Sequence, residues 1–356
     1  MRPTIISCAA ILLLVSSCTS PNFSETSWSE KVDSTRVEQL YEVHEKDGVF
    51  FNPWMQLEDR TIDVLKWKLS ASQPYTTEEE KYLPKVRNDT ASMIRAAGSR
   101  DFIAWLGHGS FLIRTGEIVW LLDPMFSKRA LIPARYTKPA LTAREINELF
   151  PAINVIISHN HYDHLDADSI RGLSEDYTFY VPKGLRKTVV EWQPKARIVE
   201  MDWWKKILLG DGYEIHCLPA QHWSRRAFDG FNTSLWASYL IISPEKQIYF
   251  GGDSGYFIGY QEFGRKYTNI DYALIPVTAY HPRWFMHEAH MNAREAIQAF
   301  QDLGARYFIP TQWGTFRLGD NPPGYSALDL KRHIKTLSLN PDPFLVPEIG
   351  QLIMIE

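Results

Sequence analysis

The sequence predicts an α/β fold in which two β-sheets pack face to face and helices cover the outer faces. Short apolar runs typical of strands first follow one another along the chain and then alternate with helical patterns. The 356 residues are 45% hydrophobic and 22% charged, which excludes a disordered, collagen-like or coiled-coil chain. The length allows two domains at most, or one large α/β domain.

The first 17 residues predict a lipoprotein signal peptide. Arg2 supplies a positive end, and residues 5–15 form an apolar stretch that is too short to span a membrane. The stretch ends in Val15-Ser16-Ser17-Cys18, which resembles a bacterial lipobox. The mature protein would then start at a lipidated Cys18 and be a membrane-anchored lipoprotein of the bacterial cell envelope, on the periplasmic or outer-membrane side. An ordinary cleaved signal with an incidental cysteine is the alternative.

Residues 18–47 are expected to form a tether between this anchor and a single folded domain over residues 48–356. The segment is rich in Ser, Thr, Glu and Lys and shows little apolar periodicity before Val43. Ordered structure is expected to begin near Gly48, where an apolar and aromatic stretch starts.

The expected strands and helices follow from apolar runs bounded by glycine and polar residues. Strands are expected over residues 102–106, 110–114, 118–122, 154–158, 178–181, 214–218, 237–242, 247–251, 272–277 and 307–310. Helices are expected over residues 63–69, 143–149, 185–193 and 292–303. In the last of these, Asn292 is the expected N-cap because Glu295 follows three residues later.

The densest cluster of candidate metal ligands lies directly after the predicted strand 154–158. It reads Ser158-His159-Asn160-His161-Tyr162-Asp163-His164. His159 and His161 point the same way in an extended chain, because side chains alternate. Three imidazoles and one carboxylate so close together are costly to bury without a cation. Their chemistry favours Zn²⁺ or a similar divalent ion.

Two further candidate ligands follow other predicted strands. His222 lies just after strand 214–218, and Asp253 lies in a glycine-flanked turn after strand 247–251. Each residue alone also fits an ordinary role, as a buried core histidine or in a capped turn. Together with the first cluster, they predict ligands from several strand ends that converge on one edge of the sheet sandwich.

These motifs resemble those of the metallo-β-lactamase superfamily. Residues 159–164 match its H-x-H-x-D-H pattern, which is typical of the whole superfamily. The flanking motifs are similar to one branch, the N-acylphosphatidylethanolamine-hydrolysing phospholipases D. They are GVFFNPW at 48–54, WLGH at 105–108, LDP at 122–124, HYDHL at 161–165, AQHW at 220–223, GDSGY at 252–256, PRWFM at 282–286 and WGTF at 313–316.

The resemblance implies an α/β protein with the four-layer αββα metallo-β-lactamase sandwich and one or two metal ions, commonly zinc. The ligands implied by motif position are His159, His161 and His222 for the first metal, Asp163 and His164 for the second, and Asp253 as a bridge between them. Two metal ions about 3.5–4 Å apart can share a hydroxide and clamp a phosphodiester.

The chain departs from the resembled family at Gln312. The family has a histidine ligand of the second metal just before its Trp-Gly-Thr-Phe motif, and this sequence has Gln312 there. An amide oxygen is a weaker donor to zinc than imidazole. We therefore expect the second metal to bind weakly, to be a harder ion such as Mn²⁺, or to be absent. His281 or His287 is an alternative donor.

Asp163 and His290 are the expected catalytic residues. Asp163 would position or deprotonate the attacking water, and His290 resembles in position a histidine at the family's active site. For His290, a surface histidine that caps the following helix is the alternative. Asp123 is expected to orient the ligand loops, and His108 is expected to have a structural role.

The expected partners are a phospholipid substrate and, through lipidated Cys18, a membrane. The formal net charge of −4 gives no overall attraction to nucleic acid, so no such partner is expected. The sequence makes no statement about oligomeric state. Trp203-Trp204-Lys205-Lys206 fits a surface beside anionic lipid, or partly buried tryptophans with solvated lysines. Trp284-Phe285-Met286 fits an acyl-chain cleft or the core.

The function implied by the resemblance is membrane-anchored, metal-dependent phosphodiester hydrolysis of the phospholipase D type. The expected substrate is N-acylphosphatidylethanolamine, and the expected products are N-acylethanolamine and phosphatidic acid. A lactonase or sugar-phosphate hydrolase on the same fold is an alternative, because a fold does not determine a substrate. The other alternative is a lipid-binding lipoprotein with a degenerate metal site.

Overall fold

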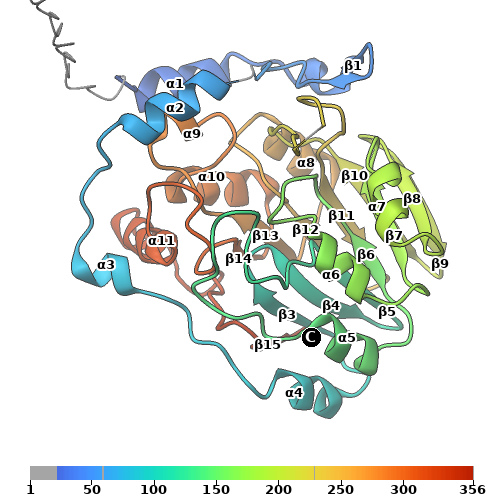
Figure 1. Ribbon diagram of the computed structural model, residues 1–356. Helices are drawn as coiled ribbons and strands as arrows, with labels where there is room; N and C mark the ends of the chain where they lie inside the picture. The colour runs from blue at the N-terminus through green and yellow to red at the C-terminus, as the bar shows by residue number, and fades with distance from the viewer. Residues whose placement is uncertain (1–21, 58–59, 228, 356) are drawn as a thin grey trace, which may run out of the picture.

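The computed structural model describes residues 22–57, 60–227 and 229–355, so the predicted signal peptide and Cys18 lie outside the described residues. Two β-sheets pack face to face at the centre of the molecule (Figure 1). One sheet has the strand order β15-β3-β4-β5-β6-β7-β8, and the other has the order β14-β13-β12-β11-β10-β9. The strands of the first sheet are β3 Phe102–Gly107, β4 Ser110–Thr115, β5 Ile118–Leu122, β6 Asn154–Ile156, β7 Thr178–Pro182, β8 Arg197–Met201 and β15 Leu352–Met354. Those of the second are β9 Lys206–Gly210, β10 Tyr213–Leu218, β11 Ser238–Ile242, β12 Gln247–Phe250, β13 Tyr272–Pro276 and β14 Tyr307–Thr311.

Helices cover the outer face of each sheet. The first sheet carries α4 Thr90–Ala97, α5 Ala143–Leu149, α6 Ala167–Gly172 and α7 Arg186–Trp192. The second carries α8 Gly259–Lys266, α10 Ala293–Leu303 and α11 Tyr325–Thr336. The molecule is thus a four-layer αββα sandwich, as the sequence predicts. In the described residues, no helix is long and apolar enough to cross a membrane.

Alternation along the central strands explains why their sequences are apolar throughout. In β3, Ile103 and Trp105 face the core between the sheets, whereas Phe102, Ala104 and Leu106 face the helices. A strand that is covered on both sides needs apolar residues at every position. Such runs are the ones that the sequence predicts within one or two residues.

The N-terminal segment packs on the domain, so the predicted tether over residues 18–47 is wrong from residue 25 onward. It forms the helix α1 Glu25–Asp33, a 3₁₀ turn at Val37–Tyr41 and a two-residue strand, β1 Glu45–Lys46, that pairs with β2 Val49–Phe50. Trp28 is 5% exposed and donates a 3.0 Å hydrogen bond to Glu295 Oε1 on α10. The domain therefore begins more than twenty residues before Gly48, the start that the sequence predicts.

The same segment covers Trp203 and Trp204, so the predicted lipid-facing patch is wrong and the alternative holds. Trp203 is buried, and Trp204 stacks on Tyr41 with 4.4 Å between the ring centroids. Trp204 Nε1 also donates to the Leu40 carbonyl at 2.7 Å. These indoles therefore fasten the N-terminal segment to the domain.

Candidate metal centre

The candidate ligands lie where strands of both sheets end at one edge of the sandwich. His159 follows β6 in the first sheet, while His222 and Asp253 follow β10 and β12 in the second. The two sheets are joined at this edge, because the Tyr239 hydroxyl donates to the Ile157 carbonyl at 3.0 Å. The convergence of strand ends that the sequence predicts is therefore present in the fold.

The loop that carries most of the ligands is held by its own backbone and by one arginine. The N–H of Leu165 donates to the His161 carbonyl at 2.8 Å and closes a tight turn. Arg226 Nη1 donates to the carbonyls of Asn160 and Leu165 at 2.7 and 2.8 Å. These bonds fix the loop before any ion binds, which is what a preorganised metal site requires.

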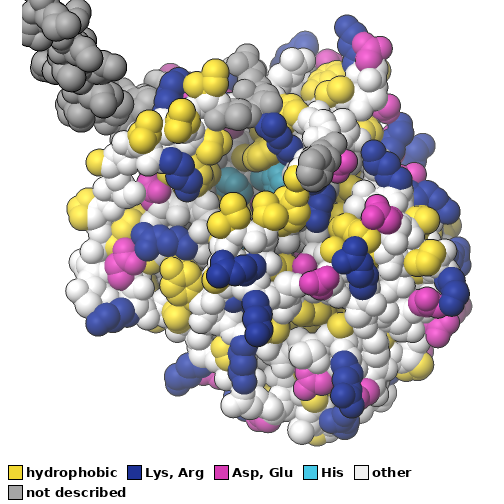
Figure 2. All heavy atoms as spheres, in the orientation of Figure 1, with side chains coloured by type: hydrophobic (Ala, Val, Ile, Leu, Met, Phe, Trp, Pro, Cys, Tyr) yellow, Lys and Arg dark blue, Asp and Glu magenta, His cyan; other side chains and the backbone are white. Residues whose placement is uncertain are grey.

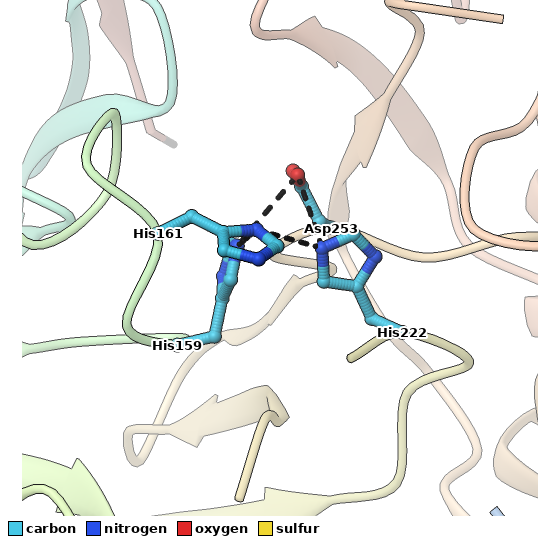
Figure 3. Close-up of side chains that lie close together, drawn as sticks. All are labelled: His159, His161, His222 and Asp253. Atoms are coloured by element: carbon cyan, nitrogen blue, oxygen red, sulfur yellow. Dashed lines mark hydrogen bonds and ion pairs between the residues drawn. The ribbon is translucent and has the colours of Figure 1, made fainter. Parts of the chain in front are cut away.

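The first group of candidate ligands comprises His159, His161, His222 and Asp253, whose ligand atoms all lie within 4.8 Å of one another (Figure 3). His161 Nδ1 lies 2.9 Å from His159 Nε2 and 3.2 Å from His222 Nε2. Asp253 Oδ2 lies 3.7 Å from His159 Nε2 and 3.6 Å from His222 Nε2. Three imidazole nitrogens and one carboxylate oxygen around a common point suit a tetrahedral zinc ion.

A second group comprises His108, Asp163 and His164, again with ligand atoms within 4.8 Å of one another. Asp163 Oδ2 lies 2.8 Å from His108 Nε2 and 3.3 Å from His164 Nε2. Asp253 Oδ1 lies 3.2 Å from His164 Nε2, although its other oxygen faces the first group. Asp253 thus stands between the two groups, with one oxygen turned to each.

Unsatisfied buried atoms show that these residues fit metal ions. His164 Nε2 and Asp253 Oδ1 are both buried, and the 3.2 Å between them lacks the geometry of a hydrogen bond. Buried polar atoms almost always have a partner, so each exception needs an explanation. A cation between the two atoms would satisfy both.

Asp123 orients the second group from behind. His164 Nδ1 lies 2.6 Å from Asp123 Oδ2, and the Ser158 N–H donates to Asp123 Oδ1 at 2.7 Å. Because Nδ1 faces this carboxylate, Nε2 is left for a ligand, as is usual for histidines that bind metals. Asp123 therefore lies where it can orient the ligand loops, the role that the sequence predicts for it.

Burial keeps the histidines of the first group in the form that binds metals. It lowers the pKa of His161 to about 4 and holds the pKa values of His159 and His222 well below 6.5. Burial also opposes ionisation of Asp163, but nearby His164 and His108 outweigh it and hold the pKa of the carboxyl well below its usual range. Near neutral pH the first group thus offers neutral imidazoles, and Asp163 and Asp253 are charged carboxylates, which are the states that metal ions require.

Comparisons with known proteins agree with this geometry. The family model described as "Beta-lactamase superfamily domain" matches residues 120–313. The chain belongs to the metallo-β-lactamase superfamily. An uncharacterized protein of Mycobacterium tuberculosis is 33% identical over 299 residues, which are 78% of this chain and 76% of that protein. N-acyl-phosphatidylethanolamine-hydrolyzing phospholipase D 1 of Caenorhabditis elegans is 32% identical over 61% of this chain and 65% of its own length.

A solved structure has a similar fold over most of this chain. Igni18, a metallo hydrolase from the archaeon Ignicoccus hospitalis, superposes with a TM-score of 0.55 at 20% identity, over 72% of this chain and 98% of that one. This similarity supports the fold, while the sequence matches support the phospholipase D-like branch. The protein is accordingly a metal-dependent hydrolase of the metallo-β-lactamase superfamily.

Gln312, where that branch has a histidine, is buried beside the second group. Its side chain and that of His164 both approach Gly109: a Cβ built there would lie 3.6 Å from Gln312 Cγ and 3.2 Å from His164 Cε1. Gln312 Nε2 donates to the Gly252 carbonyl at 2.8 Å. A carbonyl only accepts, so this bond fixes the amide orientation, and Oε1 is left buried without a partner in the described residues.

His108 is the residue of the centre that sequence reasoning missed as a candidate ligand. It lies in the turn between β3 and β4, with φ at +52°, and its Nε2 reaches Asp163. The turn approaches the ligand loop only in the folded protein, since the two histidine-bearing segments are about fifty residues apart in sequence. The glycine-flanked histidine after a strand was the only local signal.

An open cavity of about 440 Å³ leads to the centre, with His161, Asp163, Asp253 and His290 among its lining residues. His290 lies beside the first group, with its ring 5.4 Å from that of His222, and burial lowers its pKa.

His281 and His287, the alternative donors to the second metal, lie outside both groups. The ring of His281 is hydrogen-bonded to Tyr75, and that of His287 packs on Phe23 and Trp28.

Proposed function

We propose that the protein hydrolyses the phosphodiester of N-acylphosphatidylethanolamine in the manner of a phospholipase D, releasing N-acylethanolamine and phosphatidic acid. The main support for this proposal is that the two groups of candidate metal ligands lie next to an apolar pocket. The pocket, about 110 Å³ in volume, shares Trp223, Arg225 and His290 with the open cavity over the centre. A polar reaction site joined to an apolar pocket suits a lipid with a phosphodiester headgroup.

The lining of the apolar pocket suits an acyl chain. Most of its lining side chains are apolar, and three are charged: Arg60, Arg225 and Glu288. The apolar ones are Leu57, Val64, Trp223, Phe231, Phe285, Met286 and Ala289. Phe285 and Met286 belong to the segment for which the sequence left an acyl-chain cleft and a core role open. Met286 fits both roles, because it is 7% exposed and also lines the pocket.

Zinc ions held by the two groups would polarise a phosphoryl oxygen and lower the pKa of a water molecule, with Mn²⁺ an option in the second group. Asp163 faces the cavity as a charged carboxylate, so it can orient the attacking water and accept its proton. His290 is neutral near pH 7, so its ring N–H can donate to a phosphoryl oxygen or to the leaving alcohol oxygen. The water oxygen bonds to phosphorus, the P–O bond to the N-acylethanolamine breaks, and that oxygen takes up a proton.

We propose in addition that the protein is anchored to the cell envelope through an acylated Cys18. The support is the lipobox-like sequence Val15-Ser16-Ser17-Cys18 and the short apolar stretch before it. A membrane anchor would keep the enzyme beside a lipid that does not leave the bilayer. The test is Cys18→Ser in the native host, which should lower the share of the protein in the membrane fraction, and an unchanged share would contradict the anchor.

The activity itself is tested with purified protein and vesicles that contain N-acylphosphatidylethanolamine. Mass spectrometry should detect N-acylethanolamine and phosphatidic acid in equal amounts, and His161→Ala should abolish both. Hydrolysis of lactones or sugar phosphates without lipid turnover would support the alternative hydrolases instead. Lipid binding without any turnover would support a degenerate site.

A further inference from the structure

Exposed apolar side chains surround the mouth of the metal centre. Figure 2 shows hydrophobic side chains gathered around a hollow in which histidines are visible. Two segments supply large apolar residues here: the helix α2 Thr61–Leu69 and the turn at residues 129–134. Val64 of α2 lines the apolar pocket, while Leu131 and Ile132 of the turn line the open cavity, so both segments border the same entrance. We call the exposed residues Ile62, Leu65, Leu69, Leu131 and Ile132 the apolar rim.

Helix α2 has an apolar face on each side. Trp67 points into the protein, where it is 8% exposed and donates to Asp320 Oδ1 at 2.8 Å. Ile62, Leu65 and Leu69 share the opposite face by their spacing and are 75%, 62% and 68% exposed. A helix on the surface of a soluble protein normally has polar residues on its solvent-facing side. An exposed apolar face at that position is typical of a binding surface.

The turn holds its two aliphatic side chains outward in a fixed shape. Leu131 and Ile132 are 59% and 75% exposed, although the turn around them is closed by hydrogen bonds. The Ala130 N–H donates to the Pro133 carbonyl at 3.0 Å, and Arg129 Nη1 donates to the Ile132 carbonyl at 2.6 Å. Ordered backbone that displays large apolar side chains to solvent is a mark of an interaction site.

Cations flank the apolar rim on both segments. Lys66 and Lys68 are exposed on α2, and Lys128 and Arg129 are exposed at the base of the turn. Asp63 pairs with Lys66 at 2.8 Å, but residues 126–137 contain no acidic side chain. Apolar side chains bordered by lysine and arginine match a bilayer with anionic lipid, because the cations meet headgroup phosphates at the depth of the interface.

The chain also enters the domain on this side. Phe23 packs against the cluster of Trp67, Trp284 and Met286 beneath α2. Cys18 precedes Phe23 by five residues, and a stretch of that length reaches at most about 18 Å. An acyl group on Cys18 would therefore hold this side of the domain close to the membrane.

We propose that the apolar rim docks on a phospholipid bilayer, with its aliphatic side chains below the headgroups and its cations at anionic phosphates. The mouth of the metal centre then opens directly onto lipid, and a substrate can enter without crossing water. This inference rests on the proposed function for the nature of the substrate, but the docking itself depends only on the surface.

Fluorescence of a single probe tests the docking. In the full chain with Cys8→Ser and Cys18→Ser, a nitrobenzoxadiazole label is attached to Ile132→Cys, because the remaining Cys217 is buried. With vesicles of phosphatidylethanolamine and phosphatidylglycerol, its emission should rise, shift to the blue and be quenched by doxyl-labelled lipid. The matched control is Leu208→Cys on β9, where the side chain is 65% exposed away from the rim and the label should stay in water.

Equal signals from the two labelled positions would overturn the proposal. A rise at Ile132→Cys without vesicles that grows with protein concentration would indicate a second copy of the chain as the occupant, and would also overturn it. Replacing phosphatidylglycerol by phosphatidylcholine should weaken the response, because the flanking cations lose their partners.

A kinetic measurement separates docking from the proposed function. Leu65→Asp with Leu69→Asp should lower turnover of vesicle-borne substrate about tenfold and leave hydrolysis of soluble bis(p-nitrophenyl) phosphate unchanged. Leu208→Asp should change neither rate. If no phosphodiester is hydrolysed at all, the proposed function fails, while the probe still decides whether the rim docks. An equal loss on both substrates would contradict the docking role of α2.

Discussion

At the scale of single residues, the two candidate metal groups differ in the donors they offer. The first group presents three imidazoles and shares Asp253, which is a typical zinc environment. The second presents His108, His164, Asp163 and the other oxygen of Asp253, so its share of oxygen donors is higher than in the first group. Harder ions favour oxygen, so we expect the two groups to differ in metal affinity and selectivity.

Removing one imidazole from the first group should release its metal. His161→Ala should lower zinc affinity and turnover by roughly 100-fold or more, because a lost ligand costs at least as much as a lost partner of a ligand. His216→Ala is the matched control, since His216 is a largely buried histidine of β10 that bonds to Glu214, outside both groups. Metal content by mass spectrometry is the measurement, and full zinc occupancy in His161→Ala would refute the ligand assignment.

Gln312 should make the second ion the easier one to remove. After dialysis against a weak chelator, we expect the wild type to hold nearer one ion than two, because the amide oxygen replaces an imidazole. Gln312→His should restore retention of the second ion. Supplying zinc and Mn²⁺ together and measuring both in each variant shows whether the oxygen-rich donor set selects the harder ion.

Two equally tight ions in the wild type would contradict that account. His108 is then the residue to test, because its Nε2 lies 2.8 Å from Asp163 Oδ2 in the second group. His108→Gln would lower the content from two ions to one if His108 is a ligand. If His108 only orients Asp163, the ion count of the variant stays at two.

At the scale of helices and strands, local pattern predicts the strands that are buried on both faces and the helix that has a clear capping box. The strands of the sheet centres and helix α10 were predicted from apolar runs and a capping box. The edge strands β8 and β9 were not, since in both of them exposed or partly exposed residues interrupt the buried or apolar ones. Helix α8 was missed as well, because Gly259 and Gly264 lower its helix propensity and its stability comes from packing against α10.

Some residues of the candidate site could likewise be predicted from local sequence, and others could not. The ligand motif at 159–164 and the strand-end residues His222 and Asp253 were predicted because each lies in a short local pattern. His108 and the apolar rim were not, because they depend on which turns meet in space. The packing of the N-terminal segment was not predicted either, because most of its residues are polar. Only a few apolar side chains, such as Trp28, Val32 and Leu40, are buried against the domain.

A substitution in helix α1 tests whether the N-terminal segment stabilises the domain. Trp28→Ala should lower the free energy of unfolding by about 3–5 kcal/mol, the usual cost of emptying a buried tryptophan site. Val43→Ala in the same segment should have almost no effect, because Val43 is 76% exposed. Denaturant unfolding measures both, and equal stability of the two variants would mean that the segment does not contribute to the domain.

At the scale of the whole molecule, buried neutral histidines make stability depend on pH. Burial lowers the pKa values of His161, His281 and His287 to about 4, and holds those of His159 and His222 well below 6.5. An unfolded chain binds these protons near pH 6.5, so between about 6.5 and 4 it holds more protons than the folded protein. Stability from these groups is therefore full above about pH 6.5 and is lost as the pH falls toward 4.

His164 has the opposite effect on the pH dependence of stability and partly offsets that of the other histidines. Burial opposes its charge, but Asp253, Asp163 and Asp123 outweigh burial and raise its pKa well above 6.5. Its contribution is present below pH 6.5 and is lost as the pH rises through the raised value. Burial also lowers the pKa values of His216 and His290, so one histidine with this sign is opposed by seven with the other. The melting temperature of metal-free protein should therefore fall as the pH drops from 7 to 4.

Metal adds a second, separable dependence on pH. Zinc binds the folded protein and not the unfolded chain, so the loaded protein should melt at a higher temperature at pH 7. Protons compete for the same imidazoles as the pH approaches 4, so the gap between loaded and metal-free protein should shrink there. The double variant His281→Gln and His287→Gln should flatten the slope of both forms and leave the zinc-dependent gap unchanged, because neither residue lies in a ligand group. A gap that stays constant down to pH 4 would show that the ion is not held by histidines, and the imidazole-rich centre would then lose its role.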